Sequence, residues 1–245
     1  MQHDWLQRSE LLVKPEGLEK LKNARILAVG LGGVGSFAVE FLVRAGIGNI
    51  TVVDGDLVDV TNINRQLPAL RSTVGKPKVD VVADRILDIN AEIRLKKINE
   101  FLTPERMEEI LNSERFDYVL DCIDSVSPKL SLIIAAKRKK IKIISCMGAG
   151  GKTDPAKVMV RDISKTNNCF LAKQIRKRLK KEKINKGFRC VFSTEIQDET
   201  SLKLTDGSQY KKSYYGTISY MPALFGLYAA SEVIKHLLNK EYETE

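Results

Sequence analysis

The stretch GLGGVG, at residues 30–35, constrains the fold of this chain more than any other. It follows the short apolar run RILAV (25–29), and the residues from Gly32 to Ala45 have the pattern of a helix. The run NITVVD (49–54) then predicts a second strand, which ends in the acid Asp54. The glycines permit a tight turn and a close backbone approach to phosphate, while the helix start offers free N–H groups. We therefore expect a nucleotide to be bound by Gly30, Gly32, Gly33, Gly35 and Asp54. The Asp54 carboxylate would bind the ribose.

The rest of the chain continues the alternation of strands and helices. We expect strands at 94–98, 116–122 and 141–146, and helices at 76–90, 105–112 and 128–140. Such alternation predicts an α/β fold, Rossmann-like and doubly wound around a mainly parallel sheet. A C-terminal extension carries further strands at 156–164 and 188–195, a basic helix at 168–183 and a closing helix at 221–238. The closing helix is expected to pack on the core or on a partner subunit.

We expect a single domain over residues 1–245. A helical lead-in occupies 1–24, the nucleotide-binding core 25–165, and a basic substrate-binding and C-terminal part 166–245. Residues 196–213 are polar and charged, with few branched apolar side chains, and predict a mobile loop.

The amino-acid composition limits the kinds of partner the chain can bind and the cellular compartment in which it can occur. Hydrophobic residues make up 43% of the chain, which argues against global disorder. The formal net charge of +9 favours polyanionic partners, although a generally basic protein remains the simpler alternative. No apolar run approaches the roughly 20 residues of a membrane span, and the four cysteines form no CxxC pair. We expect a cytoplasmic protein with free thiols and no tetracysteine zinc site.

The stretch after Asp54 carries more polar side chains than a dinucleotide site needs. They are Asp56, Asn62, Asn64, Arg65 and Gln66, followed by Lys76 and Lys78. Cationic side chains near phosphates suit a triphosphate under attack, where charge builds on the phosphoryl oxygens. This set favours ATP over NAD, while a solvated loop remains an adequate explanation for Asp59 and Thr61.

Four motifs together resemble the ubiquitin-activating-enzyme-like superfamily of adenylating enzymes. They are VDGDLVDVTNINRQ, GLGGVG, VGKPKVD and LDCIDS, and the resemblance covers residues 8–165. The segments MGAGGKTDPAKVMVRDI, RKRL and VFSTE are similar to the tRNA threonylcarbamoyladenosine dehydratase branch, which extends the match over nearly the whole chain.

The resemblance implies an ATP-dependent cyclisation of threonylcarbamoyladenosine in tRNA through adenylation of the threonyl carboxylate. It implies catalytic roles for Arg8, Arg65, Lys78 and Asp124. Nucleotide-binding roles fall on the four loop glycines and on Asp54, Asp56, Asn62, Arg65, Gln66 and Lys78. Asp124 would hold Mg²⁺, and Arg8 would enter the partner's site in a homodimer. We also expect a cysteine desulfurase system as a further partner and a monovalent cation at loops 148–151 and 193–195.

The segment at residues 173–189 holds nine Lys or Arg and one Glu. A solvated helix face is the usual explanation of such a run, but the acids that would balance it are missing. We expect Lys177, Arg178, Lys180 and Lys181 to bind tRNA phosphates.

Three other functions compete with this interpretation. A sulfur-carrier-protein adenylyltransferase of the thiamine or molybdopterin type shares the ATP site but leaves the basic run unexplained. An NAD-dependent oxidoreductase leaves Arg65, Lys78 and Asp124 unexplained, and a non-catalytic tRNA-binding module leaves the ATP site without a use. Cys190 is either a sulfur-handling nucleophile or, as we favour in a chain with two histidines, an ordinary strand cysteine.

Overall fold

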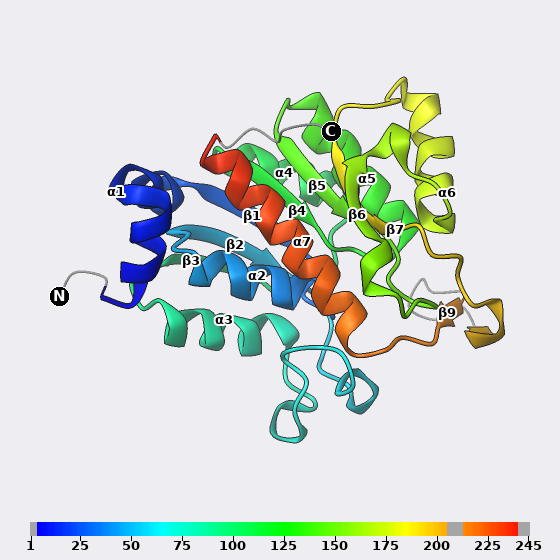
Figure 1. Cartoon of the computed structure of the whole chain (residues 1–245), viewed down its shortest axis with the longest axis horizontal. Helices are drawn as coiled ribbons and strands as arrows, with labels where there is room; N and C mark the ends of the chain where they lie inside the picture. Colours follow the sequence, from blue (N-terminus) through cyan, green and yellow to red (C-terminus); the bar gives the residue numbers. More distant parts are fainter. Residues whose placement is uncertain (1–3, 205–212, 240–245) are drawn as a thin grey trace.

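The computed structural model describes residues 4–204 and 213–239 (Figure 1). Its centre is a seven-stranded sheet in the order β3-β2-β1-β4-β5-β7-β6. All neighbouring strands are parallel except β6, which runs antiparallel to β7 at one edge. The strands are β1 (Arg25–Val29), β2 (Asn49–Val53), β3 (Arg94–Ile98), β4 (Tyr118–Asp121), β5 (Lys142–Cys146), β6 (Val158–Asp162) and β7 (Arg189–Ser193). The predicted Rossmann-like, mainly parallel α/β fold is confirmed.

Helices cover both faces of this sheet and bury apolar side chains against it, although α1 buries only Gly17 and Leu21. They are α1 (Gln7–Asn23), α2 (Gly35–Arg44), α3 (Lys78–Ile89), α4 (Pro104–Ser113), α5 (Val126–Arg138), α6 (Phe170–Leu179) and α7 (Tyr220–Leu237). One core cluster lies beneath α2, α3 and α7, and a second beneath α4, α5 and α6. In α6 the buried residues Ala172, Ile175 and Leu179 recur at helical spacing, so the basic residues Lys173, Lys177 and Arg178 face outward.

The register of the central strands creates the site. Val29, the last residue of β1, pairs with Val53 at the end of β2 and with Asp121 at the end of β4. The chain moves outward to β2 and β3 on one side of β1 and returns to β4 on the other. The carboxyl ends of β1 and β4 therefore form the switch point where doubly wound sheets bind ligands.

The C-terminal part contributes more to the core than its sequence suggests. Strand β7 lies between β5 and β6, and α7 packs closely on α2, where a side chain at Gly226 would meet the carbonyl oxygen of Val34. The closing helix thus packs on the chain's own core. The division of the chain at residue 166 stays a prediction.

Three local expectations need correction. Helix α2 begins at Gly35 and not at Gly32, because residues 30–34 form the turn that the glycines allow. The lead-in helix is broken at Lys14, whose φ is +67°, since the following Pro15 disfavours helical geometry there. Residues 196–204 are not wholly irregular: strand β8 (Leu202–Leu204) pairs with β9 (Ser213–Tyr215). The rest of the expected mobile loop, 205–212, lies outside the described residues.

Within the described ranges, no helix has the length and apolarity required to cross a bilayer.

Candidate nucleotide-binding site

The loop after β1 has a backbone that only glycine tolerates at two positions. Gly30 has φ +92°, and a side chain there would lie 2.8 Å from the carbonyl oxygen of Cys122. A side chain at Gly35 would overlap the carbonyl oxygen of Gly30. At Gly32 the space is open, with the Gln66 amide 3.6 Å away as the nearest group. Gly30 and Gly35 are thus required by the turn, whereas Gly32 leaves room for a ligand.

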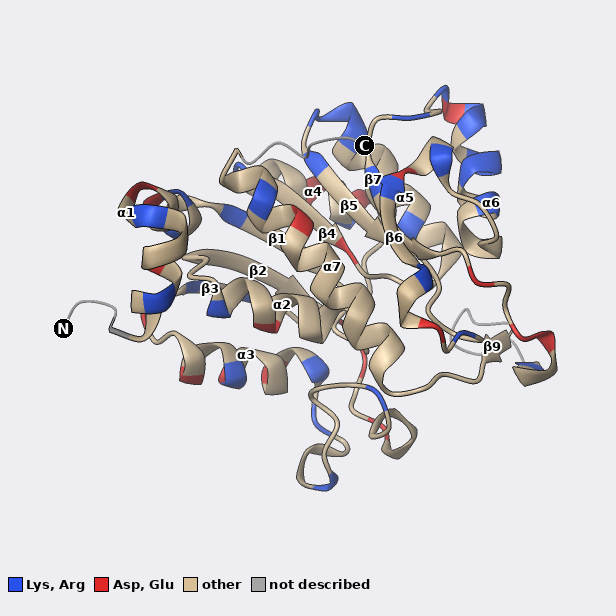
Figure 2. Cartoon of the chain, in the orientation of Figure 1, with Lys and Arg blue, Asp and Glu red and all other residues tan. Residues whose placement is uncertain are grey.

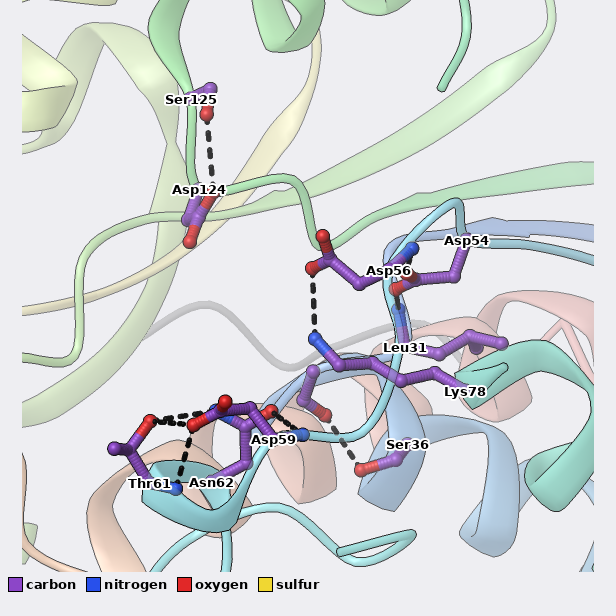
Figure 3. A network of polar contacts seen from close by, with 11 residues as sticks. Leu31, Ser36, Asp54, Asp56, Asp59, Thr61, Asn62, Lys78, Asp124 and Ser125 are labelled. Carbon is purple, nitrogen blue, oxygen red and sulfur yellow. Dashed lines mark hydrogen bonds and ion pairs between the residues drawn. The ribbon is translucent and has the colours of Figure 1, made fainter. Parts of the chain in front are cut away.

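Asp54 joins this loop to the end of β2. Its carboxylate accepts hydrogen bonds from the backbone N–H groups of Leu31, at 2.6 Å, and Asp56, at 2.8 Å (Figure 3). Burial raises the pKa of Asp54, and the nearby Lys78 ammonium opposes this shift. The two hydrogen bonds orient the carboxylate at the place where a ribose-binding acid is expected.

Lys78 and Asp56 form an ion pair across the start of α3. The Lys78 ammonium lies 2.8 Å from the Asp56 carboxylate, and its backbone N–H donates to the Asp56 carbonyl. The lysine side chain is 6% exposed and the aspartate side chain 45%. Lys78 is thereby held at the carboxyl edge of the sheet with its charge next to the nucleotide loop (Figure 3).

Gln66 contributes an unsatisfied polar atom. Its side-chain oxygen Oε1 is buried and has no hydrogen-bond partner among the residues that the structure describes. A buried acceptor without a donor costs about 1–3 kcal/mol. Because Gln66 lies over Gly32, a donor on a bound ligand, such as a hydroxyl or amino group, fits this position.

Asn62 and Arg65 lie on the turn that follows β2. The Asn62 side-chain oxygen accepts a hydrogen bond from the N–H of Asp59 at 3.2 Å, so part of its role is to hold the turn. The Arg65 guanidinium donates to the Thr61 carbonyl at 2.9 Å and to the Asn64 side chain at 2.8 Å. A guanidinium has five N–H donors, so these two contacts leave it capacity for phosphate oxygens.

Asp124 follows β4 on the other side of the switch point. It is exposed, and the Ser125 hydroxyl donates to it at 3.2 Å (Figure 3). No cluster of three or more His, Cys, Asp or Glu side chains suited to a metal occurs in residues 4–204 and 213–239. Mg²⁺ usually takes one or two carboxylates together with phosphates and water, so a single carboxylate facing a triphosphate suits it.

Arg8 does not lie at this site in its own chain. It is exposed on the first turn of α1, next to Leu6, which packs against Gly46. Gly46 follows α2 at the end remote from the nucleotide loop, and Figure 1 shows α1 at one side of the molecule. Any catalytic role of Arg8 therefore requires a second chain.

The cysteines are buried or half-buried. Burial raises the pKa of the Cys190 thiol well above its usual value, which keeps it protonated and unreactive. The sulfur atoms of Cys122 and Cys146 lie 3.9 Å apart, and this contact, with burial, raises the pKa of the Cys122 thiol. The geometry favours structural roles for these thiols.

The loops considered for a monovalent cation are already occupied by protein donors. The Ser193 carbonyl accepts from the buried Lys152 ammonium at 2.9 Å, and the Gly151 carbonyl accepts from the N–H of Asp198. Glu195 accepts from the backbone N–H groups of Thr153 and Asp154. The monovalent cation stays a prediction.

The sequence analysis missed two sets of residues, one beneath the site and one at the far end of α5. The first is a buried ion pair between Asp121 and Lys129, beneath the loop that carries Asp124. The second is the basic segment 137–142, which lies beside the predicted tRNA-binding helix. The run KRKK was a visible signal for the second, whereas nothing in the sequence pairs Asp121 with Lys129.

Comparison with known proteins gives one family. The model of the ThiF family matches residues 6–245. The tRNA threonylcarbamoyladenosine dehydratase of Bacillus subtilis (strain 168) is 42% identical over 94% of this chain and 93% of its own length. The enzyme of that name from Escherichia coli (strain K12) is 39% identical over 96% and 95%.

Solved structures agree with the sequence relatives. The E. coli tRNA N6-threonylcarbamoyladenosine dehydratase in complex with ATP superposes with a TM-score of 0.87 at 39% identity, over 98% of this chain and 97% of that one. Its complex with AMP gives the same TM-score at 38% identity. By contrast, the molybdopterin-synthase adenylyltransferase of Salmonella typhimurium (strain LT2) matches only 53% of this chain, at 39% identity, and 51% of its own length.

Proposed function

Because the chain belongs to the ThiF family, and within it to the tRNA threonylcarbamoyladenosine dehydratases, we propose that it catalyses the ATP-dependent dehydration of threonylcarbamoyladenosine in tRNA. The observation that carries this proposal is near-full-length similarity to dehydratases that bind ATP and AMP, combined with an intact nucleotide loop. The product is the cyclic form of the nucleoside.

The reaction has two steps. A threonyl carboxylate oxygen attacks the α-phosphorus of ATP, and the bond to pyrophosphate breaks. The neighbouring carbamoyl group then closes on the activated carbonyl, a proton is lost and AMP leaves. The net change in the RNA is loss of one water. Holding the nucleophile beside the carbonyl supplies a high effective molarity.

Residues of this chain would hold the reactants through the contacts described above. The Asp54 carboxylate is oriented to accept hydrogen bonds from the ribose hydroxyls. Gly32 has no side chain, so the phosphates can approach the backbone closely there. Lys78 and Arg65 would place positive charge beside the triphosphate, where charge develops in the first step. None of these roles uses a cysteine, in agreement with the burial of Cys190.

Asp124 would hold Mg²⁺ together with phosphate oxygens. The ion supplies Lewis-acid stabilisation of the phosphate charge. This assignment is supported by the exposure of the Asp124 carboxylate and by its place in the loop that follows the carboxyl end of β4, beside the switch point.

A homodimer with shared sites is part of the proposal. Its support is the distance between Arg8 and its own nucleotide loop, which leaves a partner's site as the place where this arginine can act. The four basic residues Lys177, Arg178, Lys180 and Lys181 would bind tRNA phosphates; all four are exposed, which supports that role. A cysteine desulfurase partner and a cytoplasmic location stay predictions.

The decisive experiment incubates the protein with ATP and tRNA that carries threonylcarbamoyladenosine. We expect pyrophosphate release that depends on the modified tRNA, and a nucleoside lighter by one water in the mass spectrum of the digested tRNA. Release driven by a small sulfur-carrier protein, with unchanged tRNA, would support the adenylyltransferase alternative instead. That alternative is disfavoured because its relatives match only about half of the chain.

A further inference from the structure

Two basic segments far apart in sequence form one surface on α5 and α6. Arg138, in the last turn of α5, lies 3.0 Å from Glu182, just after α6. The neighbouring Lys137 ammonium donates to the Gly187 carbonyl at 2.8 Å. We call this surface the α5–α6 basic surface; its exposed members are Arg138, Lys140, Lys142, Lys173, Lys177, Arg178, Lys180, Lys181, Lys183 and Lys186.

The two segments that form the surface carry a single acid between them. Glu182 is the only acid in segments 137–142 and 173–186, and it already pairs with Arg138. On α6, Lys173 and Lys177 lie on the outward face opposite the buried stripe, and the exposed Lys180 follows directly after the helix. Figure 2 shows the concentration of blue on α5 and α6, whereas α3 mixes both signs. Such a one-signed surface attracts a polyanion and is costly to leave unneutralised.

The far end of this surface lies at the amino ends of the strands, whereas the nucleotide site lies at their carboxyl ends. Helix α5 starts after the loop that carries Asp124 and ends at Arg138, and Lys142 begins β5 at its amino end. A helix of 13 residues spans about 20 Å. Near the other end, the Arg178 guanidinium reaches the Ser127 hydroxyl in the first turn of α5 at 3.3 Å. The surface therefore extends from near the site to about 20 Å away.

We propose that the α5–α6 basic surface binds the double-stranded stem next to the tRNA loop whose adenosine reacts, and that Lys140 and Lys142 contact phosphates of that stem. This inference rests on the proposed function. When the reactive nucleotide is in the site, the duplex stem that extends rigidly from its loop presents phosphates at fixed positions about 20 Å away, where Lys140 and Lys142 lie. Recognition of the stem is thus physically separate from the chemistry, and depends on its shape and phosphates rather than its sequence.

The test compares two substrates and two matched double variants. One substrate is full-length tRNA with threonylcarbamoyladenosine; the other is a stem-loop with the same nucleoside and a stem cut to a few base pairs. The variant is Lys140→Gln with Lys142→Gln. The control is Arg94→Gln with Lys96→Gln, two exposed basic residues on the edge strand β3.

We expect the Lys140/Lys142 variant to raise KM several-fold for full-length tRNA with kcat unchanged. KM for the short stem-loop and both constants of the control should stay at wild-type values. In binding without ATP, the slope of log affinity against log salt should fall in magnitude by about 1.4–1.8, from two contacts of roughly 0.7–0.9 each.

Unchanged KM and salt slope in the Lys140/Lys142 variant would remove these lysines from the RNA surface. Equal losses on both substrates would also overturn the inference, because the short stem-loop lacks the base pairs that lie about 20 Å from the reactive loop. If the wild-type protein dehydrates neither RNA, the proposed function fails; the salt series on unreacted tRNA still decides whether the surface binds RNA.

Discussion

Asp121 and Lys129 form an ion pair 2.7 Å long in which both side chains are fully buried. The Lys129 ammonium also donates to the Ser145 hydroxyl and the Cys146 carbonyl, so all its hydrogens have acceptors. Asp121 accepts in addition from the Ser145 hydroxyl and from the N–H of Ile123. The pair thus ties α5 to the ends of β4 and β5 and holds the segment that leads to Asp124.

Replacing Lys129 by Met should lower the free energy of unfolding by about 3–5 kcal/mol, because it leaves a buried carboxylate without its counter-charge. Burial raises the pKa of Asp121, and in the wild type the Lys129 ammonium opposes that shift. An acid whose pKa is higher in the folded state binds protons preferentially there above pH ~3.9, so stability falls as pH rises. Urea unfolding should show a larger deficit at pH 8 than at pH 5.

The control for this change is Lys97→Met. Lys97 pairs with Asp80 at 2.6 Å, but both side chains are about half exposed, so its loss should leave stability unchanged. If Lys129→Met lowers the free energy of unfolding equally at pH 5 and pH 8, the titration of Asp121 is not the cause of the lost stability.

Substitutions at two glycines of the nucleotide loop should affect different properties, Gly35→Ala the stability of the fold and Gly32→Ala the affinity for ATP. Gly35→Ala places a methyl group on the Gly30 carbonyl and should destabilise the fold strongly. Gly32→Ala meets nothing closer than 3.6 Å and should leave the thermal unfolding temperature near that of the wild type. Its methyl group would nevertheless obstruct the approach of phosphate, so calorimetry should show at least tenfold weaker ATP binding, about 1.4 kcal/mol. Wild-type affinity in Gly32→Ala would mean that phosphate does not approach this part of the loop.

Arg8→Ala and Asp124→Ala should each abolish activity in a homodimer with shared sites. Mixing the two inactive variants should restore about one quarter of wild-type activity, since about half of the dimers are mixed and each has one intact site. The measurement is pyrophosphate release after subunit exchange, which native mass spectrometry of the mixed dimer verifies. If verified mixed dimers are inactive, Arg8 does not act in the partner's site.

Cys190→Ala should leave kcat unchanged. Its thiol is fully buried in β7, and burial raises its pKa well above the usual value, so it is a poor nucleophile. Removing the sulfur leaves a small cavity that lowers the free energy of unfolding by about 1 kcal/mol. Loss of turnover in a folded Cys190→Ala protein would contradict this assignment and favour sulfur chemistry.

The nucleotide-binding unit was predictable from local sequence alone. Gly30 and Gly35 mark a turn whose backbone excludes side chains, and Asp54 ends an apolar run that reads as a strand. Alternating strands and helices predict the parallel sheet, because right-handed crossovers leave few other arrangements. These features depend on neighbours in sequence, so the sequence determines them.

The tertiary structure alone decided which distant residues meet. Strand β7 lies between β5 and β6, Lys129 is buried against Asp121, and segment 137–142 joins α6 in one basic surface. From the sequence alone, an isolated Lys or Asp is predicted to lie on the surface. A charged side chain is buried only when an oppositely charged partner and further hydrogen bonds compensate for the loss of water. Whether that partner is present depends on strand order and helix packing, which residue spacing along the chain does not specify.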